Sequence, residues 1–366
     1  MPYRAPSEKD GIVLVSRCYS VAESFFTLPE AVKTDFTEEE ASRRGYGGSC
    51  YTPLGKEPAY QEGERQHVES FSCTRPLGEA LCNHLPRGPE FHSSLFPDSQ
   101  VPGFGAAYSR LWEVLRERIS LPIMRALEDM LQLPRGFLLR RSSETESLNM
   151  SLLRTLRYPT QDNEHLGPKP FPANRVKRRR STRNQVPVDV GISEHTDFEV
   201  FTIMHQESAG LHLRTPSRGS TTRWYQLPFR YETLTVILGD MAELWTSGWL
   251  EATRHKVVSP ASGQGARRSL VLFQAHDDLV RVHPLETSHL APRVPGPDSR
   301  TEETRNSENR RRGFREGIGK RHATDSFGGW LQQRSRNIPR KYRPTTQGAW
   351  VRSQELLAKS ALETSR

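Results

Sequence analysis

Short apolar stretches that alternate with polar residues run through the middle of the chain. They are rich in β-branched and aromatic residues, and Gly, Pro, Asp or Ser separates one stretch from the next, which is the pattern of short β-strands. We predict strands at residues 148–158, 188–193, 198–205, 210–214, 234–238, 255–259, 269–275 and 280–284. Because many short strands at this spacing favour a jelly roll or barrel, we expect a mainly β core with flanking helices.

The first part of the chain follows a helical period instead. Leu and Ile recur every four positions within residues 105–133, which predicts a helix packed on the β core, kinked or divided at Pro122. A second helix is predicted over residues 19–35, with Pro29 at an internal boundary. Weaker signals indicate an unstructured start at residues 1–10 and short strands at residues 12–15, 45–51 and 67–71.

These patterns divide the chain into four regions. The first region is helical and irregular and packs on the second, a β core that carries a basic insertion. The third is a basic stretch with few apolar residues, and the fourth is a C-terminal segment with a short helix over residues 353–362. The boundaries are 1–147 for the first region, 148–285 for the core, about 165–187 for its insertion, 286–338 for the basic stretch and 339–366 for the last segment.

The net charge of +9 is concentrated in two of these regions. Residues 165–190 carry a net charge of +6 and residues 300–343 carry +8, which leaves −5 on the rest of the chain. A nucleic-acid-binding groove would instead place basic residues across the folded body. We therefore expect basic insertions on an enzyme that binds a small molecule, and no nucleic-acid partner.

The chain shows no sign of secretion or membrane insertion. No apolar run is long enough to cross a membrane, and the apolar run at residues 12–15 is too short for a signal peptide. The four cysteines form no Cys-x-x-Cys pair, so neither a zinc ribbon nor a disulfide scaffold is indicated. We expect a monomer in the cytoplasm, with the nucleus as an alternative because of the basic run from Lys177 to Arg180.

The strongest candidate site combines two histidines and an aspartate. His195 and Asp197 stand two residues apart, so their side chains point the same way on an extended segment, and His255 follows 58 residues after Asp197 at the start of a predicted strand. Two imidazoles and one carboxylate are the ligands that hold Fe(II) on one face and leave other positions open. Alternatives for the third ligand, none followed by an Arg-x-Ser pair, are His205, His212 and His276.

Twelve residues after His255, the chain reads Arg267-Arg268-Ser269. If Ser269 and the alternate apolar residues after it face inward, Arg267 faces inward too and Arg268 faces outward. A buried Arg is costly unless it is paired, and a dicarboxylate co-substrate would pair it in a bidentate manner. The alternative is an internal salt bridge to an Asp or Glu.

Around the residues described above and in several further short stretches, the chain resembles the isopenicillin N synthase-like branch of the Fe(II)/2-oxoglutarate-dependent dioxygenases. The matching stretches occur in the family's order and cover about residues 12–285, with a weaker tail near 340–362. They are residues 25–33, 44–46, 156–159, 194–198, 238–248, 255–258 and 267–269. The resemblance implies a double-stranded β-helix, or jelly roll, and it says little about the substrate.

The resemblance also implies roles for individual residues. It implies that His195, Asp197 and His255 are the ligands of Fe(II), and that Arg267 and Ser269 hold the far carboxylate of 2-oxoglutarate. The implied cofactors are Fe(II), 2-oxoglutarate as co-substrate and O₂, and the family admits ascorbate as well. The implied reaction oxidises, and by expectation hydroxylates, a small-molecule substrate and releases succinate and CO₂.

The chain departs from the family pattern in three places. Tyr158 matches a tyrosine that often adds a hydroxyl group to the 2-oxoglutarate carboxylate, but Leu156 replaces the Asn that many plant members have two residues earlier. The 24 residues before Phe25 are fewer than the family usually has, which implies a truncated N-terminal unit. Two stretches, the basic loop before His195 and residues 286–338, are longer than expected.

Two other functions fit the same residues. A related Fe(II) oxidase would bind its own substrate where 2-oxoglutarate would lie, as isopenicillin N synthase-like relatives do. A catalytically silent homologue with a truncated N-terminus would act as a binding protein through its basic loops. We expect substrate contacts from residues 40–75, from Phe201 and Ile203 and from the C-terminal tail.

Overall fold

The computed structural model describes most of the predicted core. The described residues are 8–44, 46, 49–57, 60, 64–74, 94–142, 150–160, 188–215, 223–261, 263–277, 280 and 285. Several predictions therefore lie outside the described residues, namely the basic insertion at 165–187, nearly all of the strand at 280–284, the basic stretch at 286–338 and the helix at 353–362.

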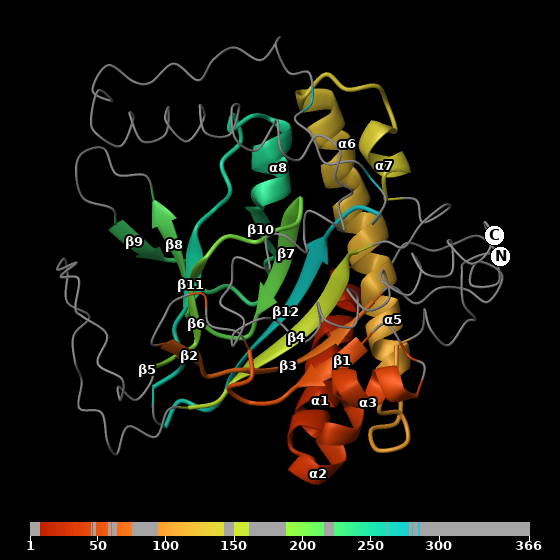
Figure 1. The fold of residues 1–366 in the computed structure, drawn as a ribbon, viewed down its shortest axis with the longest axis vertical. Coiled ribbons are helices and arrows are strands. Elements are labelled where there is room, and N and C mark those ends of the chain that lie inside the picture. The colour runs from red at the N-terminus through yellow and green to blue at the C-terminus, as the bar shows by residue number, and fades with distance from the viewer. Residues whose placement is uncertain are drawn as a thin grey trace, which may run out of the picture.

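Two antiparallel sheets form the core (Figure 1). The major sheet has six strands in the order β1 (Ser49–Thr52), β3 (Glu69–Cys73), β4 (Leu152–Tyr158), β12 (Arg267–Gln274), β7 (Phe201–Gln206) and β10 (Thr235–Leu238). The minor sheet has the order β6 (Ile192–His195), β11 (His255–Val257), β8 (Leu211–Thr215) and β9 (Arg223–Gln226). A parallel pair joins β2 (Glu64–Gln66) to β5 (Val188–Val190).

The two sheets enclose a small apolar interior. Alternate residues of the strands point into it, because successive side chains of a strand leave on opposite faces. Its buried members are Val68, Leu156, Tyr158, Met204, Leu211, Ile237, Val257 and Val271. This arrangement confirms the predicted jelly roll with flanking helices.

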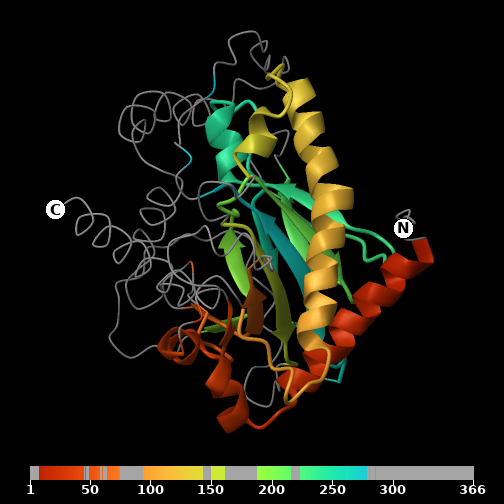
Figure 2. The same cartoon turned by 90° about the vertical axis from the view of Figure 1, so that its right-hand side faces the viewer.

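A long helix covers the outer face of the major sheet (Figure 2). It consists of α5 (Phe104–Leu115), a π-helical turn at Arg116–Ser120 and α6 (Leu121–Met130). Pro122 lies in the first turn of α6, where proline is tolerated, so the predicted helix over residues 105–133 is divided just before the proline. The larger apolar core lies between this helix, α1 (Glu8–Phe26) and the sheet.

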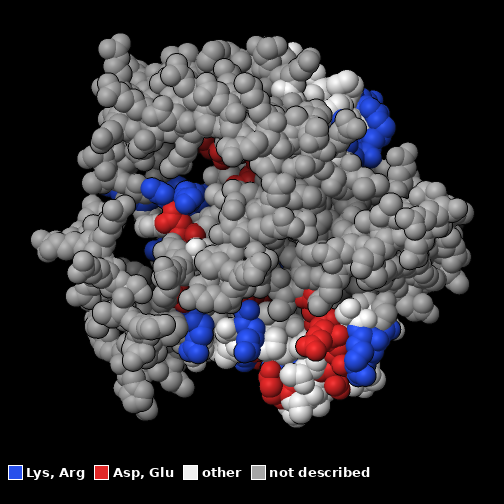
Figure 3. Space-filling view, viewed as in Figure 1, with Lys and Arg blue, Asp and Glu red and all other residues white. Residues whose placement is uncertain are grey.

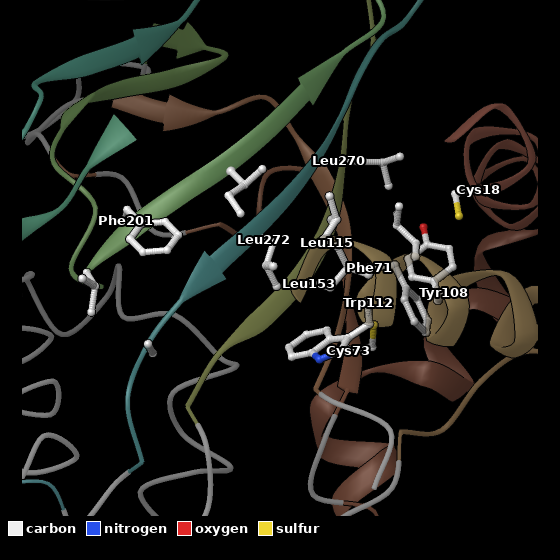
Figure 4. Close-up of a cluster of buried hydrophobic side chains, with 14 of the residues drawn as sticks. Cys18, Phe71, Cys73, Tyr108, Trp112, Leu115, Leu153, Phe201, Leu270 and Leu272 are labelled. Carbon is white, nitrogen blue, oxygen red and sulfur yellow. The ribbon is translucent and has the colours of Figure 1, made fainter. Parts of the chain in front are cut away.

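Side chains from all three elements meet in this core (Figure 4). Phe71 of β3 contacts the ring of Tyr108 of α5 edge-on, with ring centroids 6.2 Å apart. Cys18 of α1 and Cys73 of β3 are buried free thiols, and burial raises the pKa of Cys18 to about 12. No disulfide therefore joins these two described cysteines.

The first forty residues differ from the prediction. Residues 12–15, predicted as a strand, lie within α1, and Glu8 to Asp10, predicted as unstructured, also belong to this helix. The helix predicted over residues 19–35 ends at Phe26, and Pro29 precedes a second short helix, α2 (Glu30–Lys33). Short helices that the pattern did not predict are α3 (Glu38–Arg43), α7 (Phe137–Arg140) and α8 (Asp240–Trp245).

The surface of the described part shows mixed charge. On the face shown in Figure 3, basic and acidic side chains lie side by side around α3, where Glu40 pairs with Arg43 and Arg44. Within the described ranges no single helix has the length and apolar composition of a membrane span; one pair, Gly11–Phe26 with Glu30–Phe36, meets the test together but is bent by 113°.

Candidate metal centre and co-substrate site

The two candidate histidine ligands face each other across adjacent strands. His195 of β6 and His255 of β11 are direct partners in the antiparallel ladder, and their ring centroids lie 4.2 Å apart. Each ring donates its Nδ1 hydrogen to the carbonyl oxygen two residues earlier, at 2.8 Å to Ser193 and 2.9 Å to Thr253. These bonds orient both rings and leave both Nε2 atoms as lone-pair donors, as metal-binding histidines require.

Asp197 completes the group just after β6. Its Oδ1 lies 3.5 Å from Nε2 of His195 and 3.6 Å from Nε2 of His255, while its Oδ2 accepts a hydrogen bond from the hydroxyl of Thr202 in β7. The three potential ligand atoms all lie within 4.8 Å of one another. The structure therefore brings together the three residues that the sequence singled out, and their donor set fits Fe(II).

The protonation states of this group also suit a metal. Burial by itself would raise the pKa of Asp197, but His255, His195 and the hydrogen bond from Thr202 outweigh burial and lower the pKa to about 2. Burial and the neighbouring His195 lower the pKa of His255 to about 4. Near neutral pH the site thus presents a carboxylate and a neutral His255, which are the forms that bind divalent metals.

The alternative third ligands point elsewhere. His205 lies on the other face of β7, where its ring nitrogens contact the hydroxyl of Tyr19 and the carbonyl of Tyr231. The Nδ1 atom of His276 forms a hydrogen bond with the hydroxyl of Ser142. His212 of β8 is opposite Lys256, on the face of the minor sheet away from His255.

Arg267 is one of the most deeply buried side chains, with 1% of its surface exposed. Its Nη2 donates to the side-chain oxygen of Gln206 at 2.7 Å, and its Nε donates to the carbonyl of Ala209 at 3.2 Å. Within the described part of the chain its Nη1 is buried without a hydrogen-bond partner, and Arg267 forms no ion pair. The alternative of an internal salt bridge is therefore absent among these residues, and the free donor fits a carboxylate.

Tyr158 and Ser269 lie beside Arg267. Tyr158 of β4 is the direct partner of Arg267 in the sheet, and the guanidinium carbon lies 4.9 Å from the centre of its ring. Ser269 is 1% exposed and forms a hydrogen bond with Tyr158. The structure thus places all three predicted co-substrate residues in one cluster.

Several residues that support the site were not predicted from the sequence. The hydroxyl of Thr202 donates a hydrogen bond to Asp197, and the side-chain oxygen of Gln206 accepts one from Arg267. The ring of Tyr60 stacks on His195 with centroids 4.5 Å apart. At Gly210 a Cβ atom would lie 2.9 Å from Nε of Arg267, so only glycine leaves room for this arginine. Thr202 and Gln206 lie on the same face of β7, so the alternation of side chains along this strand could have identified them.

Two predicted substrate contacts are wrong. Phe201 and Ile203 were expected to line the substrate pocket, but both lie in the large core on the helical side of the major sheet. The residues of β7 that alternate with Phe201 and Ile203 face the interior instead.

Comparisons with known proteins agree with this geometry. The family model of the 2OG-Fe(II) oxygenase superfamily matches residues 154–276, a range that contains all six predicted site residues. Residues 154–276 of the chain thus carry a 2OG-Fe(II) oxygenase domain.

Proteins named as 2-oxoglutarate-dependent enzymes resemble the chain over about two thirds or more of its length. It is 25% identical over 250 residues to the 2-oxoglutarate-Fe(II) type oxidoreductase ppzD of Metarhizium rileyi, covering 67% of this chain and 62% of the relative. It is 26% identical over 267 residues to the 2-oxoglutarate-dependent dioxygenase caaD of Aspergillus niger, covering 73% and 71%. The chain thus spans less than two thirds of the length of ppzD.

The fold of the chain also resembles solved structures. A full-length protein of Neurospora crassa, crystallised in complex with alpha-KG, superposes with a TM-score of 0.56 at 17% identity, covering 80% of this chain and 78% of the Neurospora chain. At this identity the likeness supports the jelly-roll fold alone.

Proposed function

We propose that this chain is a non-heme, Fe(II)- and 2-oxoglutarate-dependent dioxygenase that hydroxylates a small-molecule substrate and releases succinate and CO₂. The observation that carries the proposal is the combination of the His195, Asp197 and His255 cluster with a buried Arg267 whose Nη1 has no partner among the described residues. A metal cluster alone would fit many functions. The buried arginine in the same barrel adds a receptor for a carboxylate.

Each residue of the site has a defined task in this proposal. His195, Asp197 and His255 would hold Fe(II), which together with 2-oxoglutarate supplies the oxidising power for O₂ activation. Arg267 would bind the far carboxylate of 2-oxoglutarate in a water-poor environment, where such a charge-assisted contact is strong. Ser269 and Tyr158 add hydroxyl groups to the same carboxylate.

The surrounding residues keep this machinery in place. The Nδ1 bonds of the two histidines and the Thr202 bond of Asp197 fix the direction of the ligand atoms. Leu156 stands where many relatives have an asparagine, and it lies buried in the interior cluster directly opposite Ser269. The 2-oxoglutarate carboxylate would then receive no hydrogen bond from a side-chain amide at the position of Leu156.

The test is a measurement of succinate release. The Fe(II)-loaded chain is incubated with O₂ and a panel of small molecules, with and without 2-oxoglutarate, and a true substrate should increase succinate formation only when 2-oxoglutarate is present. An oxidase of the isopenicillin N synthase type would instead consume O₂ with its substrate whether or not 2-oxoglutarate is added. A silent binding protein would take up no Fe(II) and would bind nucleic acid in a strongly salt-dependent manner.

A further inference from the structure

The interior face of the major sheet carries a row of buried polar side chains away from the co-substrate cluster. In the sheet register Arg154 of β4 is opposite Ser72 of β3, and Ser70 of β3 is opposite Thr52 of β1. By strand alternation Arg154 shares its face with Tyr158, which lies in the interior cluster. Ser70 and Ser72 are fully buried and Thr52 is 2% exposed, so these polar groups line the barrel and do not reach bulk solvent.

Two contacts hold Arg154 in place. Its Nη2 donates to the carboxylate of Glu57 and to the hydroxyl of Ser70, the latter at 2.8 Å, and Ser70 in turn donates to Glu57 at 2.9 Å. The side chain of Arg154 is 14% exposed and that of Glu57 is 7% exposed. Because the ion pair is shielded from water, the guanidinium is held firmly in one place.

Three donors of this row are left without partners. Within the described part of the chain, Nε of Arg154 and the hydroxyls of Ser72 and Thr52 are buried and make no hydrogen bond. Burying such groups is unfavourable unless something else satisfies them. A bound molecule that offers hydrogen-bond acceptors would satisfy them.

The row lies close to the candidate metal centre. Tyr60 stacks flat on His195, with an angle of 3° between the rings. Asp197 of the metal cluster and the Glu57–Arg154 pair both influence the pKa of the Tyr60 hydroxyl, so both lie in the neighbourhood of this tyrosine. The direct partner of Arg154 in β12 is Val271, four residues beyond Arg267. The polar row thus lies on the same interior face as the co-substrate cluster but is separate from it.

The charge of the row defines the group that it accepts. Glu57 already balances the positive charge of Arg154, and the groups without a partner among the described residues are one N–H, which can only donate, and two hydroxyls, which can donate as well as accept. A carboxylate placed here would bring a second negative charge beside Glu57, whereas a neutral oxygen would accept the hydrogen bonds without one. We propose that Arg154 anchors the substrate and that the substrate offers a neutral oxygen acceptor, such as an amide or ketone carbonyl. This inference rests on the proposed function.

Matched probes test this specificity. Cyclohexanecarboxamide, cyclohexanecarboxylate and cyclohexylmethylamine present a neutral, an anionic and a cationic head on one ring. Their binding to the full chain, loaded with Fe(II) and 2-oxoglutarate without O₂, is measured by titration calorimetry. We expect the amide to bind about tenfold more tightly than the carboxylate, as expected for one hydrogen bond to a charged group.

Substitutions in β4 provide the variant and its control. Arg154→Lys keeps the charge that pairs with Glu57 but removes the Nε donor, and it should weaken amide binding about tenfold. Arg157→Lys is the control, because Arg157 lies on the opposite face of the same strand and pairs with Glu69 and Glu23.

Glu57→Gln removes the balancing charge and should shift the preference toward the carboxylate. If Arg154→Lys does not fold, Ser72→Ala removes one donor of the row without changing charge and should weaken the amide alone.

The outcomes separate this inference from the proposed function. A wild-type preference for the carboxylate, no binding of any probe, or equal effects of Arg154→Lys and Arg157→Lys would overturn the role of Arg154 while Fe(II) and 2-oxoglutarate still bind. Failure of the wild-type chain to bind Fe(II) and 2-oxoglutarate, measured first, would instead overturn the proposed function.

Discussion

Arg267 and Arg268 are neighbours in β12, yet their guanidinium groups lie on opposite faces of the major sheet. Arg267 points into the barrel beside Gln206, and one of its buried nitrogens has no partner in the part of the chain that the structure describes. Arg268 points toward the helical layer and pairs with Glu207 and Glu23. The pair therefore offers an internal comparison between a ligand-binding arginine and a structural one.

Replacing each arginine separately should give different effects. Arg267→Ala removes the proposed charge-assisted contacts to the 2-oxoglutarate carboxylate, worth roughly 3 kcal/mol, so 2-oxoglutarate affinity should fall about a hundredfold. Arg268→Ala removes ion pairs outside the barrel and should leave that affinity nearly unchanged. Calorimetric titration of 2-oxoglutarate into both Fe(II)-loaded variants measures the difference, and equal losses would refute the assignment of Arg267.

Gly210 should be required for the position of Arg267. Its φ is +138°, and an added Cβ would lie 2.9 Å from Nε of Arg267 and 2.9 Å from the carbonyl oxygen of Val258. Gly210→Ala should therefore displace Arg267 and lower 2-oxoglutarate affinity about tenfold, in addition to a backbone strain of about 1–3 kcal/mol. Gly263→Ala is the control, because Gly263 has a φ of +82° but no described atom lies within 4 Å of where its Cβ would be. Similar 2-oxoglutarate affinities of the two variants would contradict the steric explanation.

Thr202 should control metal affinity through Asp197. Thr202→Val removes the hydrogen bond to Oδ2 and should weaken Fe(II) binding about 10- to 100-fold, as is usual for a residue that orients a metal ligand. Thr155→Val is a matched control, because Thr155 is equally buried but is bonded to Tyr108 on the other face of the sheet. Competition with a metal-sensitive dye measures both, and a loss of metal affinity in the control as large as in Thr202→Val would show that the effect is not specific.

Stability of the metal-free chain should fall in acid partly because of His276. Burial, and to a lesser extent Arg141, lower the pKa of His276 to about 3. The unfolded chain binds a proton there below about pH 6.5, so stability is fully present above that pH and is lost as the pH falls toward 3. The slope is about 1.4 kcal/mol per pH unit for this one proton.

His276→Asn should flatten this pH dependence, because it keeps a polar side chain near Ser142 but removes the titrating ring. Urea unfolding of the metal-free chain between pH 7 and pH 4 gives the comparison. The partly exposed His212 provides the control variant, His212→Asn. Parallel pH profiles for wild type and His276→Asn would exclude His276 as a source of the acid sensitivity.

Local spacing was sufficient to group His195 with Asp197 and Arg267 with Ser269. His195 and Asp197, like Arg267 and Ser269, lie two residues apart, and strand alternation alone places each pair on one face. The ladder between β6 and β11 then sets His255 opposite His195. For these residues the one-dimensional pattern carries most of the three-dimensional information.

Elements that depend on distant contacts were not predictable in the same way. Residues 12–15 are apolar in succession and resemble a strand, but packing of Cys18 and Phe25 against the core makes them part of α1. Strand β9 is mostly exposed and lacks alternation. The polar row of Thr52, Ser70 and Arg154 exists only because β1, β3 and β4 pair across long sequence separations.

Anaerobic equilibrium dialysis with Fe(II) tests the central claim most directly, because every further step of the proposed reaction requires the metal. The measurement compares the wild-type chain, Asp197→Ala, His255→Ala and, as a histidine control on the other face of the minor sheet, His212→Ala. We predict one Fe(II) per chain for the wild type and for His212→Ala, and loss of stoichiometric binding for the other two variants. Undiminished Fe(II) binding by Asp197→Ala, or none by the wild type, would contradict the account.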